Sequence, residues 1–144
     1  MKITYLVLII LVAASCAQVN QDSAREIGVG FIAGGQEYQL EITQAQLSDS
    51  PSWLESRDNP PLAPGKALRI ARAHLNSVVP DAKAWSLENI IIMPVGGGKS
   101  VYIIEFQEPI PLEFSTGVWD IYKVMVLMDG SVGKAKMRPL GGKL

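Results

Sequence analysis

Four carboxylates gather in the last third of the sequence, in an arrangement that could support acid–base chemistry or hold a cation. They are Glu105, Glu108, Glu113 and Asp120. Two carboxylates that face each other across a sheet can divide into a proton donor and a proton acceptor, and their oxygens also suit hard cations. However, they alternate with isoleucine and valine, which is typical of the solvent side of amphipathic strands. We therefore expect a solvated surface, and we predict no catalytic, cofactor-binding or metal-ligating residue.

Two glycine-rich strings resemble nucleotide-binding motifs but lack the required context. GGGKS (96–100) resembles the end of a phosphate-binding loop, yet Met93 occupies the position of the first glycine, and the strand-like run VYIIEF follows instead of a helix. GVGFIA (28–33) fits the dinucleotide fingerprint by letter, but no helix follows it. We interpret the first as a hairpin turn and the second as a strand containing a bulge.

Nucleophilic catalysis has no local support in this chain. A serine or thiol nucleophile needs a base within hydrogen-bond reach. The only histidine, His74, falls in a predicted helix, and the only cysteine, Cys16, ends an apolar N-terminal segment. A single cysteine also excludes an internal disulfide and a multi-cysteine zinc site. We expect a protein that is not an enzyme and that uses no cofactor.

The N-terminal residues 1–15 have the pattern of an export signal. A lysine at position 2 precedes the apolar run 3–14, which is too short to cross a bilayer and is followed at once by small residues. The string Ala-Ala-Ser-Cys ending at Cys16 resembles the lipobox of bacterial lipoproteins, in which the cysteine becomes the lipidated N-terminus. The usual leucine of that motif is Ala13 here, and ordinary cleavage after Ala17 is the alternative. We favour lipidation, because the chain offers the thiol no other role.

These observations predict a location and a domain organisation. We expect a lipoprotein of the outer membrane that faces the periplasm, with a soluble periplasmic or secreted protein as the alternative after cleavage at Ala17. Residues 16–25 are expected to form a tether, and residues 26–140 a single domain. The 144 residues are 48% hydrophobic and 19% charged, as in ordinary globular domains, and the net charge of −1 offers no strong attraction to nucleic acid.

The elements that must position the candidate residues follow from hydrophobic periodicity. Residues 26–43 alternate around Gly34-Gly35 and predict a hairpin, whereas 44–63 show no sustained period apart from a short helical turn near 53–57. Pro64 begins the one confident helix, with an apolar face of Ala67, Ile70, Ala71, Leu75 and Val78 and a basic, solvated stripe of Lys66, Arg69 and Arg72. Four strands follow, at 84–94, 101–108, 118–128 and 131–137.

This order predicts an α+β fold. An N-terminal β-hairpin precedes one main helix, which packs on a four-stranded antiparallel meander in the order β-β-α-β-β-β-β. Lysines on the last strand are expected to protect an exposed sheet edge. The proline-punctuated loop 109–117 contains Ile110, Leu112 and Phe114, which we predict to contact a partner, because apolar loop residues on a rigid sheet commonly do so.

Three stretches, PGKALRIARAHL, VYIIEF and VMVLMDGSVGKAKM, resemble the PepSY-like domains of bacterial envelope proteins. The likeness covers about residues 62–137. It implies a cystatin-like arrangement of one helix against an antiparallel sheet, and a regulatory or inhibitory role towards a protein partner without catalysis. The hairpin 26–43 has no counterpart in a minimal PepSY unit, and the Q-x-V-x-G loop of cystatin inhibitors is absent from the sequence.

We therefore expect a non-enzymatic binding or accessory domain of the bacterial cell envelope, held to the membrane through lipid on Cys16 and directed at an envelope protein, not at nucleic acid. The first alternative is a carrier of a small apolar ligand in a cavity between helix and sheet. A small hydrolase that uses Glu105 and Asp120 is a third and weaker alternative.

Overall fold

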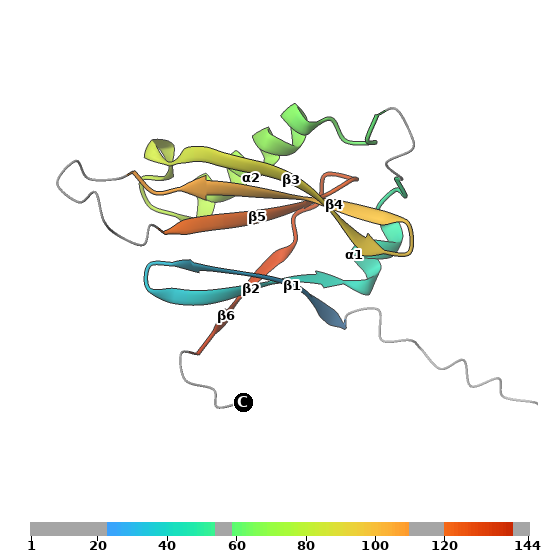
Figure 1. Ribbon diagram of the computed structural model, residues 1–144, viewed down its shortest axis with the longest axis horizontal. Helices are drawn as coiled ribbons and strands as arrows, with labels where there is room; N and C mark the ends of the chain where they lie inside the picture. Colours follow the sequence, from blue (N-terminus) through green and yellow to red (C-terminus); the bar gives the residue numbers. More distant parts are fainter. Residues whose placement is uncertain (1–22, 54–58, 110–119, 140–144) are drawn as a thin grey trace, which may run out of the picture.

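The computed structural model describes residues 23–53, 59–109 and 120–139. Its elements are β1 (Ala24–Ala33), β2 (Gln36–Thr43), α1 (Gln44–Asp49), α2 (Pro64–Val78), the 3₁₀ turn η1 (Ala82–Ala84), β3 (Ser86–Gly96), β4 (Lys99–Gln107), β5 (Ile121–Leu127) and β6 (Lys134–Arg138). The predicted α+β class is confirmed. Two three-stranded antiparallel sheets, β3-β4-β5 and β1-β2-β6, stack with α2 on the outer side of the first (Figure 1).

The predicted N-terminal hairpin is confirmed. β1 and β2 pair antiparallel around Gly34 and Gly35, whose φ angles of 57° and 69° favour glycine in such a turn. The register shifts between Glu26 and Gly30, and Gly28 between them has a φ of 73°. GVGFIA is therefore a bulged strand, as interpreted from the sequence. β1 begins at Ala24, within the stretch predicted as a tether.

Helix α1 was not predicted, although its start signal is present in the sequence. Thr43 Oγ1 accepts a hydrogen bond from the Gln46 backbone N–H at 3.2 Å, and Gln46 Oε1 accepts one from the Thr43 N–H at 3.1 Å. This reciprocal pair is a capping box. At the other end of α1, Lys99 Nζ donates to the carbonyl oxygens of Ser48 and Ser50. The lysine of GGGKS thus caps a helix from the first residue of β4, directly after a hairpin turn, and the glycines form the turn that the sequence predicted.

The main helix begins at Pro64 as predicted and packs on β4 and β5. Ala67, Ala71 and Leu75 are fully buried, and the two small alanine side chains let the helix approach the sheet closely. Val78 is 48% exposed, so its placement on the buried face was wrong. The reason is that Val78 is the last residue of the helix, where its side chain borders an open cavity.

The four-stranded meander predicted from the sequence was wrong in its last strand. β3, β4 and β5 form a meander, but β6 pairs with β2 in the other sheet. The Asp129–Gly130 turn does return the chain along β5 as far as Gly133, whose N–H bonds to the Met125 carbonyl at 3.0 Å. β6 then leaves β5, and a Cβ at Gly133 would lie 3.2 Å from the Glu41 carbonyl oxygen. Glycine permits this close crossing between the sheets.

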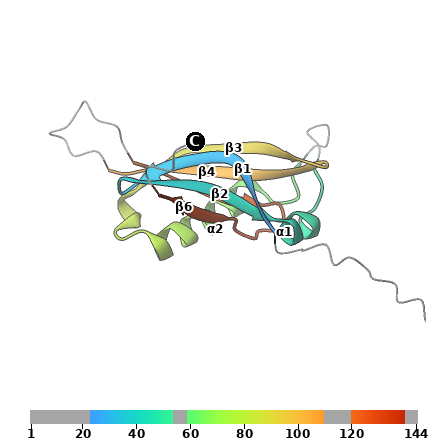
Figure 2. The same cartoon turned by 90° about the horizontal axis from the view of Figure 1, so that it is seen from below.

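The sheet β3-β4-β5 is the middle layer, and β4 is buried on both faces. Tyr102, Ile104 and Phe106 share one face, and Val101 and Ile103 share the other; all five are at most 2% exposed. Tyr102 Oη on the helix side donates to the Leu62 carbonyl at 2.7 Å. In Figure 2, which views the molecule from below, β1 and β2 lie in front of this layer and α2 lies behind it. β6 forms an edge of the outer sheet, as its lysines predicted.

Candidate functional site

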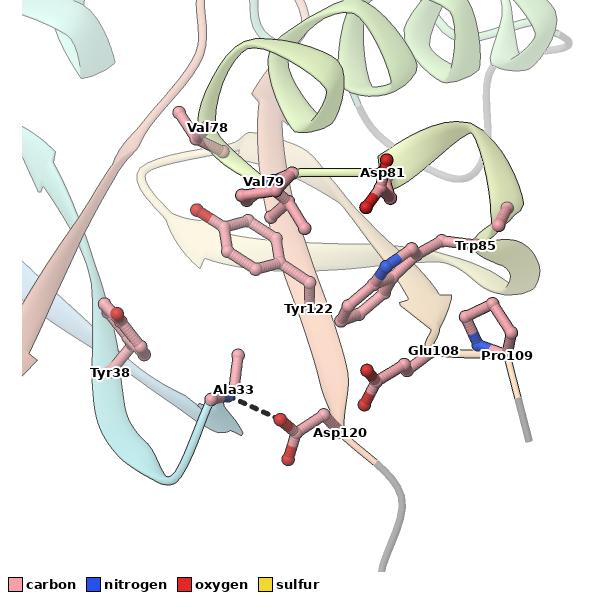
Figure 3. A pocket seen from close by; sticks show the side chains of 13 residues that line it. Ala33, Tyr38, Val78, Val79, Asp81, Trp85, Glu108, Pro109, Asp120 and Tyr122 are labelled. Carbon is pink, nitrogen blue, oxygen red and sulfur yellow. Dashed lines mark hydrogen bonds between the residues drawn. The ribbon is translucent and has the colours of Figure 1, made fainter. Parts of the chain in front are cut away.

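A cavity of about 670 Å³ opens where four structural elements meet. Its walls come from the end of α2 and the following turn, the residues directly after β4, the start of β5, and the β1–β2 hairpin (Figure 3). The lining residues are Ala33, Gly34, Tyr38, Val78, Val79, Pro80, Asp81, Ala84, Trp85, Glu108, Pro109, Asp120 and Tyr122. Because the four elements are distant in sequence, only the tertiary fold creates this site.

Three aromatic side chains, Tyr38, Trp85 and Tyr122, line the cavity. Phe31 supports two of them from behind: its ring lies 5.0 Å from that of Tyr38, stacked, and 4.9 Å from that of Tyr122, tilted. Burial raises the pKa of the Tyr122 phenol, and the neighbouring Tyr38 raises it further. Tyr122 therefore stays a neutral phenol at physiological pH, and its ring is a fixed, apolar surface with a polar tip.

Three carboxylates, Asp81, Glu108 and Asp120, lie around the aromatic side chains. Asp120 Oδ2 accepts a hydrogen bond from the Gly34 backbone N–H, which ties β5 to the hairpin turn. The Glu108 N–H bonds to the Asp120 carbonyl oxygen at 3.1 Å and continues the β4–β5 pairing. None of the lining residues is a lysine, arginine or histidine. The cavity therefore carries a net negative charge.

Arg72 on α2 holds the wall that contains Asp81 and Trp85. Its Nη1 donates to the carbonyl oxygens of Trp85 at 2.7 Å and Ala82 at 3.4 Å, and its guanidinium carbon lies 4.2 Å from the centre of the Phe106 ring. The prediction that Arg72 belongs to a solvated basic stripe was wrong, because η1 folds back over the helix and supplies these acceptors. Lys66 and Arg69 are exposed as predicted.

The carboxylates proposed as an acid–base pair are separated by their partners. Glu105 lies within an ion pair with Lys123 (2.7 Å) and accepts a hydrogen bond from Asn89 (2.9 Å). It is 7% exposed, so the expectation of a solvated side chain was wrong; the second sheet covers this face of β4. Asp120 bonds to the hairpin turn instead. Glu113 lies outside the described residues.

Burial by itself raises the pKa of Glu105, but the hydrogen bonds from Lys123 and Asn89 and the charge of Lys123 lower it more, so that the net pKa lies below its ordinary value. A carboxylate held ionised by a fixed lysine is a structural ion pair and a poor proton donor. Across residues 23–53, 59–109 and 120–139, no three His, Cys, Asp or Glu side chains gather as a metal site would require.

The remaining predicted site residues lie outside the described residues. These are Cys16, predicted to carry lipid, and Ile110, Leu112 and Phe114, predicted to contact a partner. The last three belong to the stretch that connects Pro109 to Asp120, two residues that line the cavity.

Sequence reasoning missed Asp81 and Tyr38 as site residues. Tyr38 lies within the alternating pattern of the predicted hairpin and Asp81 directly follows Pro80 beyond the predicted helix, so neither belongs to a motif of its own. Asp81 adopts a left-handed backbone with a φ of 56°, which redirects the chain from α2 into η1 and brings Trp85 to the cavity. An Asp directly after a helix-ending proline is a signal for such a bend.

No family model, curated protein or solved structure matches this chain. Among the described residues, no helix is both long enough and apolar enough to cross a membrane.

Proposed function

We propose that this chain is a non-enzymatic binding domain of the bacterial cell envelope, anchored through lipid on Cys16, and that its cavity binds an organic cation with an apolar body. One observation supports the binding function above all. Three aromatic side chains and three carboxylates line the same cavity, and no basic side chain lies among them. A site with this composition attracts positive charge and excludes anions.

The physical chemistry of the site selects the ligand class. Aromatic rings attract alkylammonium and guanidinium groups through their negative faces, and desolvation strengthens the effect. Carboxylates add charge-assisted hydrogen bonds to the same groups. The volume of about 670 Å³ falls in the usual range of ligand sites. Three carboxylates make the cavity unsuited to a wholly apolar ligand, so the carrier function expected as an alternative is proposed here only for an amphipathic cation.

A lysine or arginine side chain of a protein partner and a free small amine share this chemistry. The first source agrees with a regulatory or inhibitory role in the envelope. In this chain one main helix packs on an antiparallel sheet. The PepSY-like resemblance implies a cystatin-like fold with the same general arrangement, and this agreement supports such a role. The pairing of β6 with β2 departs from a single meander, so this resemblance remains a proposal.

The binding prediction is tested by calorimetric titration with matched probes. We expect hexylammonium and short lysine or arginine peptides to bind, and hexanol and hexanoate not to bind, because only the cations satisfy the carboxylates. Asp81→Asn and Glu108→Gln should each weaken binding about tenfold, the equivalent of about 1.4 kcal/mol. If the peptides bind much more tightly than hexylammonium, the ligand is a side chain of a protein partner. If hexylammonium binds more tightly than the peptides, the ligand is a small amine.

The control variant for the titration is Glu88→Gln, which removes an exposed carboxylate on β3, outside the cavity. It should bind the cations as the parent chain does. Equal binding of hexanol and hexylammonium would contradict the proposed ligand class, as would unchanged affinity in both cavity variants.

The membrane anchor has its own test, the intact mass of the protein extracted from membranes. A chain that begins at Cys16 and carries acyl groups is the expected result. Cys16→Ser should abolish the added mass and release the protein from the membrane fraction. An unmodified chain that begins at Gln18 would contradict the lipid anchor and leave the cavity function untouched.

A further inference from the structure

Strand β3 presents a long, apolar edge. It forms one side of the middle sheet, and α2 packs on β4 and β5 and leaves β3 largely uncovered (Figures 1 and 2). Leu87, Ile90 and Ile91 are 39%, 38% and 44% exposed. Among the residues that the structure describes, no strand pairs with the outer edge of β3. Its outward backbone groups form a template for another strand.

Other strands at the sides of the sheets carry features that discourage pairing, and the middle of β3 does not. β6 bears Lys134, Lys136 and Arg138, and β1 is interrupted by the bulge at Gly28. In β3 the register shifts only near its two ends, between Leu87 and Asn89 and between Pro94 and Gly96. The run between them, Asn-Ile-Ile-Ile-Met, is regular and uncharged.

We propose that two copies of this chain pair through β3, antiparallel and about a two-fold axis at Ile91. In this register Ile90 lies opposite Ile92 of the second copy, and Asn89 opposite its Met93. The result is a continuous sheet that crosses the dimer. A two-fold contact of this kind uses the same patch on both copies and closes upon itself.

Charge and side-chain type favour a second copy over an unrelated strand. The only charge in β3 is Glu88, which this register places opposite Pro94 of the second copy, so the two Glu88 carboxylates lie at opposite ends of the contact. Ile90 and Ile91 point to opposite faces of the sheet, and both are exposed. An added strand must therefore be apolar on both faces, and β3 itself has this property.

Pro94 fixes which backbone groups face outward and marks the end of the contact, because in this register it faces Glu88 of the second copy and has no N–H to donate to it. Proline is tolerated in an edge strand where its nitrogen points away from the neighbouring strand, here away from β4. Even-numbered residues of this run then direct their backbone groups outward. Ile90 and Ile92 can exchange hydrogen bonds across the axis, and Ile91 forms the closely spaced, non-hydrogen-bonded pair with its own copy.

Cysteine cross-linking tests the pairing and the register together. The mature chain carries Cys16→Ser, so that each introduced cysteine is the only thiol. The Cα atoms of Ile91 and its copy should lie about 4.5 Å apart. Ile91→Cys should therefore form a disulfide-linked dimer under mild oxidation. Ile90→Cys is the matched control: it is similarly exposed, but its copy lies about 7–8 Å away, beyond the usual reach of a disulfide.

A second measurement uses the chain without added thiols. Sedimentation should show a concentration-dependent dimer, and Ile91→Lys should raise its dissociation constant at least tenfold while circular dichroism remains unchanged. A chain that stays monomeric at millimolar concentration would overturn the proposal. Equal cross-linking at positions 90 and 91 would overturn it as well, since that pattern indicates nonspecific collision. Neither outcome bears on the cavity, because no β3 residue lines it.

Discussion

Replacement of Arg72 by alanine should lower the free energy of unfolding by about 3 kcal/mol. The guanidinium donates to the carbonyl oxygens of Trp85 and Ala82 and lies over the Phe106 ring. Hydrogen bonds from a charged donor contribute about 1.5–3 kcal/mol, and a partly buried cation–π contact adds about 1 kcal/mol. Urea denaturation followed by tryptophan fluorescence and circular dichroism measures the loss.

Two further variants separate the contacts of Arg72 from its charge. Arg69→Ala removes an exposed arginine of the same helix and should change stability by less than about 0.5 kcal/mol. Arg72→Lys keeps the charge but loses the planar group, so it should recover only part of the stability. If Arg72→Ala and Arg69→Ala had equal effects, the contacts seen for Arg72 would have no energetic role.

Arg72→Ala should also weaken cation binding, since it releases the wall that contains Asp81 and Trp85.

Loss of the lysine partner of Glu105 is expected to have the second-largest effect. Lys123→Met removes the ion pair at 2.7 Å and leaves a 7% exposed carboxylate with Asn89 as its remaining partner. Leaving a largely buried charge without its counter-charge costs about 2 kcal/mol at neutral pH. Glu105→Gln with Lys123→Met should be milder than Lys123→Met alone, because no charge then stays buried.

The pH dependence of stability tests the same pair. The net pKa of Glu105 in the folded protein lies below its ordinary value of 4.5. The folded state therefore favours the ionised form, and this stabilisation is present above about pH 4.5 and disappears as the pH falls through the folded pKa. Stability of the parent chain should decline below pH 4.5 more steeply than that of Glu105→Gln. Parallel acid limbs for the two chains would contradict a coupled Glu105–Lys123 pair.

Local structure could be predicted wherever short-range chemistry specifies it. The glycine pair at 34–35 requires a tight turn, Pro64 favours a first helical position, and Asp129-Gly130 favours a tight turn; all three occur at these places, although β6 does not continue the last turn as a hairpin with β5. The capping box of α1 was equally readable as Thr43-x-x-Gln46. It was overlooked because the helix has only six residues, too few to show a hydrophobic period.

Exposure of polar side chains could not be predicted from alternation alone. Glu105 alternates with isoleucine as a solvent-facing residue would, yet a second sheet covers that face. Arg72 lies on the polar side of its helix, yet η1 returns over it. The unbroken apolar runs VYII (101–104) and VMVLM (124–128) indicate strands buried on both faces, which requires a middle layer. Period two identifies a strand but does not reveal how many layers enclose it.

By itself the sequence determined the class of the fold, the β1–β2 and β3–β4 hairpins, the main helix and the absence of a nucleotide-binding motif, because each depends on residues close together in the chain. Only the tertiary structure decided that β6 joins β2, that the middle sheet is covered on both faces, and that Asp81, Glu108 and Asp120 surround the same aromatic side chains. The physical reason is that these contacts join segments far apart in the sequence, and no short-range pattern in either segment specifies its partner. Their geometry follows from how the layers stack around one core.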